Sequence, residues 1–160
     1  HPNYRSMIEL VKEGHNILVS RTASKVHGLA GLRVGFAITT PEIAKRLESY
    51  LTDSLNIVGL RAAIASYQDK RFQAYSIEQN NRAKKVITNH LDSKGIEYLD
   101  SQTNFIFFKT GMDINEFQPA MEKNGVIVGR PFPPYNTWCR LSMAKPEEMG
   151  RFIEGFDALL

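Results

Sequence analysis

The chain has 160 residues, of which 42% are hydrophobic and 23% are charged, so its composition is that of a globular protein and excludes a disordered chain. Its formal net charge of +3 is spread among acids without any block of like charges, and we therefore expect no nucleic-acid partner. No apolar run reaches the length of a membrane-spanning helix, so we expect no membrane association either.

The first part of the chain alternates predicted helices and strands. Apolar spacing and the positions of Gly and Pro predict, in chain order, a helix over 6–13, a buried strand over 16–20, a loop over 24–31, a strand over 32–39 and helices over 40–51 and 57–67. This alternation is typical of proteins that mix helices with sheets.

The second part begins with a long surface helix, predicted over 70–94 and ended by Gly95. Then follow predicted strands over 96–99 and 104–109, a helix over 113–124, strands over 126–128 and 137–144, and a final helix over 146–160. We therefore predict an α/β fold whose second part is a small α+β domain. One domain is expected over residues 1–68 and the other over 69–160, with the long helix as the link between them.

The stretch SKVHGLAGLRVG, residues 24–35, carries the candidate chemistry. Lys25 follows a predicted buried strand, and we expect its amine to be partly desolvated and able to attack a carbonyl carbon, forming a Schiff base. Thr22 and Ser24 contribute hydroxyls, and the glycines allow Arg33 to fold back toward them, which would make a cradle for a phosphate. A Schiff-base lysine beside a phosphate cradle is what pyridoxal phosphate requires.

The same residues also have simpler interpretations. A lysine before a loop is usually only solvated, and Arg33 could pair with an acid. A dinucleotide site is less favoured, because GLAGLRVG has the spacing G-x-x-G-x-x-x-G rather than G-x-G-x-x-G. The histidines do not have the spacing of metal ligands, so we predict no metal site and interpret His27 as a neighbour of the lysine site.

Longer segments add a family resemblance. SRTASKVHGLAGLRVGFAI resembles the lysine segment of fold-type I pyridoxal-phosphate-dependent aminotransferases of class I/II, and most closely the histidinol-phosphate aminotransferase branch. SQTNFIFFK and GVIVGRPFPPYNTWCRLSMAKPEEMGRFIEGF resemble the small C-terminal domain of that family. The resemblance implies that residues 1–68 are the tail end of the large cofactor-binding domain, and that residues 69–160 are a linking helix and the C-terminal small domain.

The resemblance implies a role for each residue of the lysine segment. Lys25 matches the lysine that binds pyridoxal 5'-phosphate covalently and acts as general acid and base. Thr22 and Arg33 match the ligands of the cofactor phosphate, and Ser24 is a further candidate contact.

Three residues of the second part are candidates for substrate binding. Arg140 in WCRLSMA matches the arginine that binds the substrate carboxylate, a task suited to the planar guanidinium. Its simpler interpretation is an arginine on a strand that pairs with an acid. Arg130 is a candidate for the other end of the substrate, although GRPFPP also suits a surface corner, and Asn104 lies near the expected pocket, where it could equally bond the backbone.

For the whole protein the resemblance implies a homodimer that exchanges an amino group between an amino acid, such as histidinol phosphate, and a 2-oxo acid. The single cysteine, Cys139, excludes an internal disulfide, and we expect a cytoplasmic location. The family's aspartate that pairs with the pyridinium nitrogen lies ahead of the lysine region, so we expect these 160 residues alone to be inactive. A decarboxylase or lyase on the same fold, and a folding or dimerisation module without a cofactor, stay open as alternatives.

Overall fold

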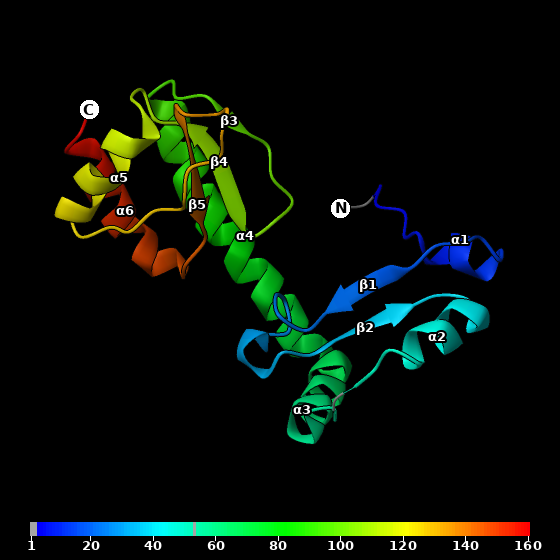
Figure 1. The fold of residues 1–160 in the computed structure, drawn as a ribbon. Helices are drawn as coiled ribbons and strands as arrows, with labels where there is room; N and C mark the ends of the chain where they lie inside the picture. Colours follow the sequence, from blue (N-terminus) through cyan, green and yellow to red (C-terminus); the bar gives the residue numbers. More distant parts are fainter. Residues whose placement is uncertain (1–2, 53) are drawn as a thin grey trace. The chain divides into compact units, whose positions relative to one another are not determined.

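The computed structural model describes residues 3–52 and 54–160 (Figure 1). The chain divides into two compact units, His1–Ser76 and Ile77–Leu160, and each is described by itself. Helices and strands occur in both units, which confirms the predicted α/β class. The assignment of residues 1–68 and 69–160 to two domains stays a prediction. None of the helices in the described ranges has the length and apolar character that crossing a membrane needs.

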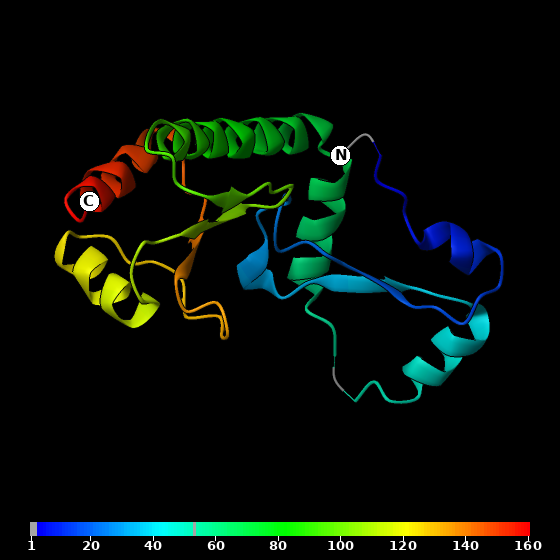
Figure 2. The ribbon, with the colours of Figure 1, turned by 90° about the horizontal axis from the view of Figure 1, so that it is seen from above.

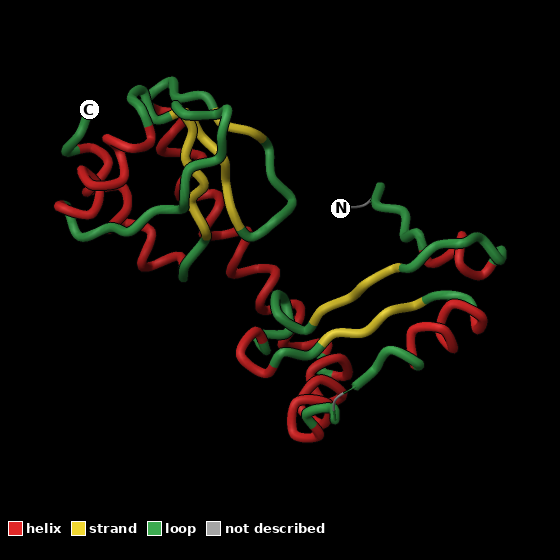
Figure 3. The backbone as a smooth tube through the Cα atoms, viewed as in Figure 1, coloured by secondary structure: helices red, strands yellow, loops and turns green. Residues whose placement is uncertain are grey.

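The first unit is built around a pair of antiparallel strands. Strand β1 (Val19–Thr22) pairs with β2 (Gly35–Ile38) so that Val19 lies opposite Ile38 and Thr22 lies opposite Gly35. Figure 3 shows this pair as distinct from the sheet of the second unit. The helices of the unit are α1 (Ile8–Lys12), α2 (Pro41–Glu48), α3 (Ile57–Gln68) and the first turns of α4 (Lys70–Ser93).

Helix α3 is held at its N-terminal end against the segment that precedes β2. The Asn56 side chain caps the helix by accepting a hydrogen bond from the Gly59 amide at 3.0 Å, and its amide group donates to the Leu32 carbonyl at 3.4 Å. A Cβ atom at Gly59 would lie only 2.7 Å from a methyl group of Val34, so glycine is what lets the helix approach this closely. Residues 32–34 and α3 therefore form one packed structure.

The second unit is a three-stranded antiparallel sheet with helices on one face. The strand order is β3 (Tyr98–Leu99), β4 (Phe105–Lys109), β5 (Trp138–Ser142), and the helices are α4, α5 (Ile114–Lys123) and α6 (Met149–Asp157). Figure 2 shows α4 as one unbroken helix. At the start of α5 the Asp113 side chain accepts from the Asn115 amide at 2.8 Å, which is the cap that a helix over 113–124 requires.

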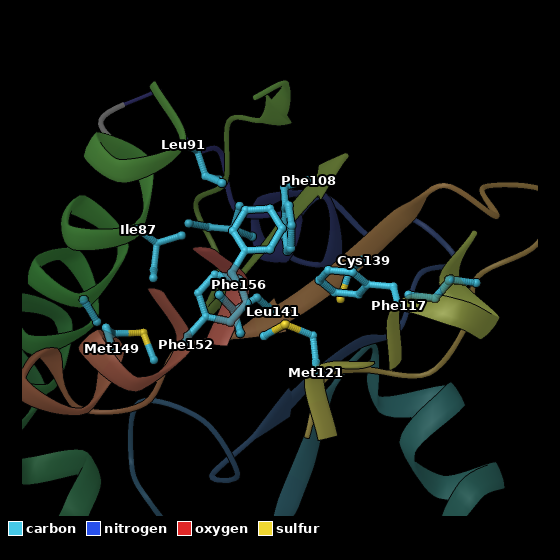
Figure 4. Close-up of a cluster of buried hydrophobic side chains, with 13 residues drawn as sticks. Ile87, Leu91, Phe108, Phe117, Met121, Cys139, Leu141, Met149, Phe152 and Phe156 are labelled. Carbon is cyan, nitrogen blue, oxygen red and sulfur yellow. The ribbon is translucent and has the colours of Figure 1, made fainter. Parts of the chain in front are cut away.

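The core of the second unit lies between that sheet face and the three helices (Figure 4). Alternate residues of the two longer strands, Ile106 and Phe108 of β4 and Cys139 and Leu141 of β5, point into it. The helices contribute Ala83, Ile87, Leu91, Ile114, Phe117, Met121, Met149, Phe152 and Phe156. The other residues of the two strands lie on the opposite face, which leaves that face available for a site.

The first predicted strand is displaced and is not buried. It was expected over 16–20, whereas β1 covers Val19–Thr22, and its residues alternate between half-buried and exposed. The physical reason is that β1 has one paired neighbour, β2, among the described residues, rather than the covered sheet that a continuous apolar run indicates.

Two predictions in the second unit also need correction. The segment 126–128 forms no strand, because the Val126 amide donates instead to the Met121 carbonyl at the end of α5, at 3.0 Å. The final helix, predicted over 146–160, starts with a short 3₁₀ turn at Pro146–Glu148 and becomes α-helical only over Met149–Asp157.

A charged cluster joins the ends of α4 and α6. Asp157 lies at the C-terminal end of α6, where the helix dipole disfavours an acid. His90 contacts its carboxylate at 2.8 Å and Lys94 at 3.3 Å. Desolvation raises the pKa of Asp157, but the hydrogen bonds and charges of Lys94 and His90 outweigh it, and the net pKa is lowered.

We expect the stabilising effect of this cluster to be lost in acid. Because the pKa of Asp157 is lower in the folded chain, its stabilisation is present above the unfolded value of 3.8 and disappears as the pH falls through the folded value. The difference in unfolding midpoint between the wild type and Asp157→Asn should therefore shrink between pH 5 and pH 2. Glu122→Gln on α5 is the control, and an Asp157→Asn difference that stayed constant over this range would contradict the expectation.

Candidate functional site

Lys25 begins a tight turn directly after β1. The Gly28 amide donates to the Lys25 carbonyl at 2.9 Å, and Gly28 has a positive φ of +68°, which glycine adopts without strain. The Leu29 amide donates to the carbonyl of Ala23, which is 1% exposed. The backbone of the turn is therefore anchored while the Lys25 side chain is exposed. The partial desolvation predicted for Lys25 is therefore wrong within the described residues, because none of them covers its side chain.

Two hydroxyls lie beside the lysine and bind each other. The Thr22 hydroxyl donates to the Ser24 hydroxyl at 2.8 Å, and it accepts from the Ser24 amide at 3.1 Å. The hydroxyl hydrogen of Ser24 is not used in this pair. Thr22 is exposed and Ser24 is half-buried, and the free hydroxyl hydrogen of Ser24 is a donor for an oxyanion.

Arg33 reaches the same end of the strand pair from the other side. The Ala23 amide donates to the Val34 carbonyl at 3.0 Å, so Ser24 and Arg33 are the next residues outward on the two segments. Arg33 has a φ of +54°, and one of its guanidinium nitrogens donates to the Ala30 carbonyl at 2.7 Å. The remaining N–H groups of this exposed side chain are available to an anion.

The last turn of α3 contacts the lysine turn at several points. Ser66 and Tyr67 hydrogen bond to His27 and Thr22, and the His27 ring lies on the Tyr67 ring with centroids 3.8 Å apart. Sequence reasoning identified His27 only as a neighbour of the site and missed both α3 residues. Local spacing carries no signal for them, because they lie about 40 positions further along the chain.

In the second unit Arg140 lies on the sheet face opposite the core. It stands on β5 across from Phe107, and its guanidinium carbon is 5.4 Å from the ring centroids of both Phe105 and Phe132. Its Nε atom is buried and has no hydrogen-bond partner among the described residues. The alternative that Arg140 pairs with an acid is not observed in this part of the chain. A buried N–H without a partner is unfavourable, so it points to a missing acceptor.

Arg130 lies over the same phenyl ring. Its guanidinium carbon is 4.2 Å from the Phe132 centroid, and the side chain donates to the Pro131 carbonyl at 3.2 Å. Two guanidinium groups therefore share the Phe132 ring. The backbone brings Gly129 against Arg140, because the Gly129 amide donates to the Arg140 carbonyl at 3.2 Å and a Cβ atom there would lie within 2.5 Å of that oxygen.

Asn104 lies on the surface, whereas Cys139 lies in the core. Asn104 is exposed just before β4, and its backbone carbonyl accepts from the Met143 amide at 2.9 Å.

Cys139 is fully buried in the core, and burial raises the pKa of its thiol to about 12, so it is not a nucleophile. Among the described residues, no group of three or more His, Cys, Asp or Glu side chains could hold a metal ion.

Comparison with protein families gives a match over nearly the whole chain. Residues 1–156 match the family model described as "Aminotransferase class I and II". The chain is 35% identical over 153 residues to histidinol-phosphate aminotransferase 1 of Dechloromonas aromatica, and the alignment covers 94% of this chain and 42% of that protein. It is 30% identical over 148 residues to histidinol-phosphate aminotransferase of Akkermansia muciniphila, covering 92% of this chain and 41% of that protein. The chain thus spans about two fifths of the length of these relatives.

Solved structures agree. A candidate histidinol-phosphate aminotransferase from Erwinia carotovora atroseptica superimposes with a TM-score of 0.94 at 32% identity, covering 99% of this chain and 46% of that one. Histidinol-phosphate aminotransferase from Sinorhizobium meliloti, solved in complex with pyridoxal-5'-phosphate, gives a TM-score of 0.82 at 26% identity, covering 96% of this chain and 44% of that one. The resemblance inferred from the lysine segment and from the C-terminal segments is confirmed.

Proposed function

Since the chain belongs to the family of class I and II aminotransferases, we propose that the protein containing it is a transaminase that uses pyridoxal 5'-phosphate. It exchanges an amino group between an amino acid and a 2-oxo acid. The observation that carries this proposal is the exposed Lys25 on an anchored turn, with two hydroxyls and a guanidinium gathered at the same end of the β1–β2 pair.

The donor set fits the cofactor. Pyridoxal phosphate, when bound, supplies an aldehyde that condenses with amines and a ring that stabilises negative charge on the adjacent carbon. The Lys25 amine matches the aldehyde, and the Thr22 and Ser24 hydroxyls and the Arg33 guanidinium match the phosphate. Arg33 uses one of its nitrogens on the Ala30 carbonyl, which fixes the side chain and leaves other N–H groups for the anion.

With the cofactor bound, Lys25 would have a second task. Its free amine would take the proton from the substrate carbon as a general base and then give that proton back as a general acid. The anchored backbone of the turn limits where this amine can reach, which is what proton transfer over a short distance requires.

Arg140 is proposed to bind the carboxylate of the amino acid or of the 2-oxo acid. Its guanidinium carbon lies 5.4 Å from the ring centroids of Phe105 and Phe132, and its buried Nε lacks an acceptor that a carboxylate would supply. Arg130 beside it is proposed to bind a second anionic group of the substrate, and Asn104 a polar one. The role of Arg140 rests on its match to the family pattern and on this geometry, that of Arg130 on the Phe132 ring it shares with Arg140, and that of Asn104 on its place just before β4.

Arg140→Lys is expected to raise KM for the 2-oxo acid and to lower kcat/KM by about 10–100-fold, since an ammonium cannot form the forked pair with a carboxylate. Steady-state kinetics measures it. Arg151→Lys, an exposed arginine on α6, is the matched control and should leave the rates unchanged. An Arg140→Lys variant with wild-type KM would remove the carboxylate role from this residue.

Histidinol phosphate is the proposed amino donor, because the relatives of Dechloromonas aromatica and Akkermansia muciniphila carry that name. A homodimer is proposed as the active form. That the 160 residues alone are inactive stays a prediction, and so does the cytoplasmic location.

The proposal is tested by trapping. The protein containing this chain is incubated with pyridoxal phosphate, reduced with borohydride and digested, and the pyridoxyl group is expected on Lys25. The same protein should convert histidinol phosphate and 2-oxoglutarate to glutamate. Release of CO₂ in place of amino transfer would make it a decarboxylase, and absence of any trapped group would favour a module without a cofactor.

A further inference from the structure

The last turn of α3 binds the backbone on both sides of Lys25. The Tyr67 hydroxyl donates to the carbonyl of Thr22, three residues before the lysine, at 3.3 Å. The Ser66 hydroxyl donates to the carbonyl of His27, two residues after it, also at 3.3 Å. Lys25 is therefore the exposed residue between two fixed points.

His27 adds its side chain to this attachment. Its imidazole is 7% exposed, lies over the Tyr67 ring at an interplanar angle of 32°, and has Nδ1 3.2 Å from the Ser66 hydroxyl oxygen. Ser66 has one hydroxyl hydrogen, so both contacts are hydrogen bonds at the same time only when that hydrogen goes to the His27 carbonyl and the oxygen accepts from Nδ1. In that arrangement Nδ1 carries a hydrogen.

The two α3 residues are themselves held in place. The side-chain amide of Gln73 donates to the carbonyls of Ser66 and Tyr67, at 3.0 Å each. These carbonyls belong to the last turn of α3, and that of Ser66 also accepts from the Asp69 amide at 3.2 Å. The lysine turn is thus attached to a helix end that is already fixed.

We propose that His27 is a positioning residue which, with Ser66 and Tyr67, sets the place of the Lys25 amine. The inference rests on the proposed function, in which Lys25 carries the chemistry. The lysine side chain is long and flexible, so the location of its amine is limited mainly by its backbone. A displacement of about 1 Å is enough to slow a reaction that depends on orientation.

The first test asks whether His27 holds the turn. Ring NMR of the protein containing this chain should show hydrogen on Nδ1 of His27. His27→Phe keeps the ring stack but loses this donor, and it should speed hydrogen exchange of the Gly28 and Leu29 amides by about tenfold. His27→Asn keeps an N–H near the Nδ1 position and should restore most of the protection. Thr39→Val, which removes the 2.8 Å hydrogen bond to the Ile17 carbonyl in the same unit, is the matched control and should leave these amides unchanged.

The second test asks whether the contacts of His27 with Ser66 and Tyr67 affect the reactivity of the Lys25 amine. In the protein containing this chain, the ratio of borohydride-trapped pyridoxyl group on Lys25 to that on the exposed Lys45 should fall about tenfold in His27→Phe. It should recover in His27→Asn.

The two tests separate the possible failures. Three results would overturn the positioning role and leave the proposed function intact. They are an unchanged trapping ratio in His27→Phe, unchanged hydrogen exchange of the Gly28 and Leu29 amides in that variant, and hydrogen on Nε2 of His27 alone. No trapping on Lys25 in the wild type overturns the proposed function, and the positioning role falls with it.

Discussion

Lys25→Ala is expected to lower the rate of transamination by about 10²–10⁴-fold in the protein that contains this chain, the range associated with loss of a general acid and base. The residue is exposed at the start of an anchored turn, so its truncation removes the amine without disturbing the hydrogen bonds of Ala23, Gly28 and Leu29. The loss should therefore appear in kcat, while the unfolding midpoint of the protein stays the same.

Two comparisons isolate the effect of the amine. Lys45→Ala removes another exposed lysine of the same unit, on α2, and should keep the wild-type rate. Added ethylamine should restore part of the rate of Lys25→Ala, since a small amine can occupy the space of the missing side chain. A Lys25→Ala variant that transaminates normally would end the assignment of Lys25 as the catalytic residue.

Phe108→Ala is expected to destabilise the second unit by about 3–5 kcal/mol, because it leaves a cavity at the centre of the core. The Phe108 side chain is fully buried, and its ring centroid lies 5.5 Å from that of Phe156, 5.7 Å from Phe152 and 6.1 Å from Phe117 (Figure 4). All three contacts are edge-to-face, so truncation removes favourable ring interactions as well as buried area.

Urea unfolding followed by tryptophan fluorescence measures this change. The chain has one tryptophan, Trp138 on β5, so the signal reports the second unit. Leu99→Ala on β3 is the control: this side chain is 54% exposed, and its loss should cost less than about 1 kcal/mol. A Phe108→Ala variant within 1 kcal/mol of the wild type would show that the core is not arranged as described.

The elements that could be predicted were those with strong local signals. Helix α4, expected over 70–94, covers Lys70–Ser93, because its apolar spacing is partly helical and Gly95 ends it. Strand β4 was expected over 104–109 and covers Phe105–Lys109 for a similar reason. The strand predicted over 126–128 was wrong because the Val126 amide hydrogen bonds to Met121 at the end of α5. A short apolar run in the sequence does not reveal such a partner.

In the candidate site, too, the features within one short segment could be predicted and those that depend on the surroundings could not. The lysine segment carries Thr22, Ser24, Lys25 and Arg33 within 12 positions, and the strand pair brings the two hydroxyls and Arg33 to one end as their spacing suggested. The exposure of Lys25 was not predicted, because desolvation is a property of the surroundings rather than of the segment.

The sequence by itself determined to which family the chain belongs and which residues are candidates for its chemistry, because both depend on residue types at short, fixed spacings. Only the tertiary structure decided what holds those residues in place. Ser66 and Tyr67 bind the turn around Lys25 across about 40 positions, and Arg130 and Arg140 share the ring of Phe132. Contacts of this kind arise when separate segments pack together, and local spacing does not encode them.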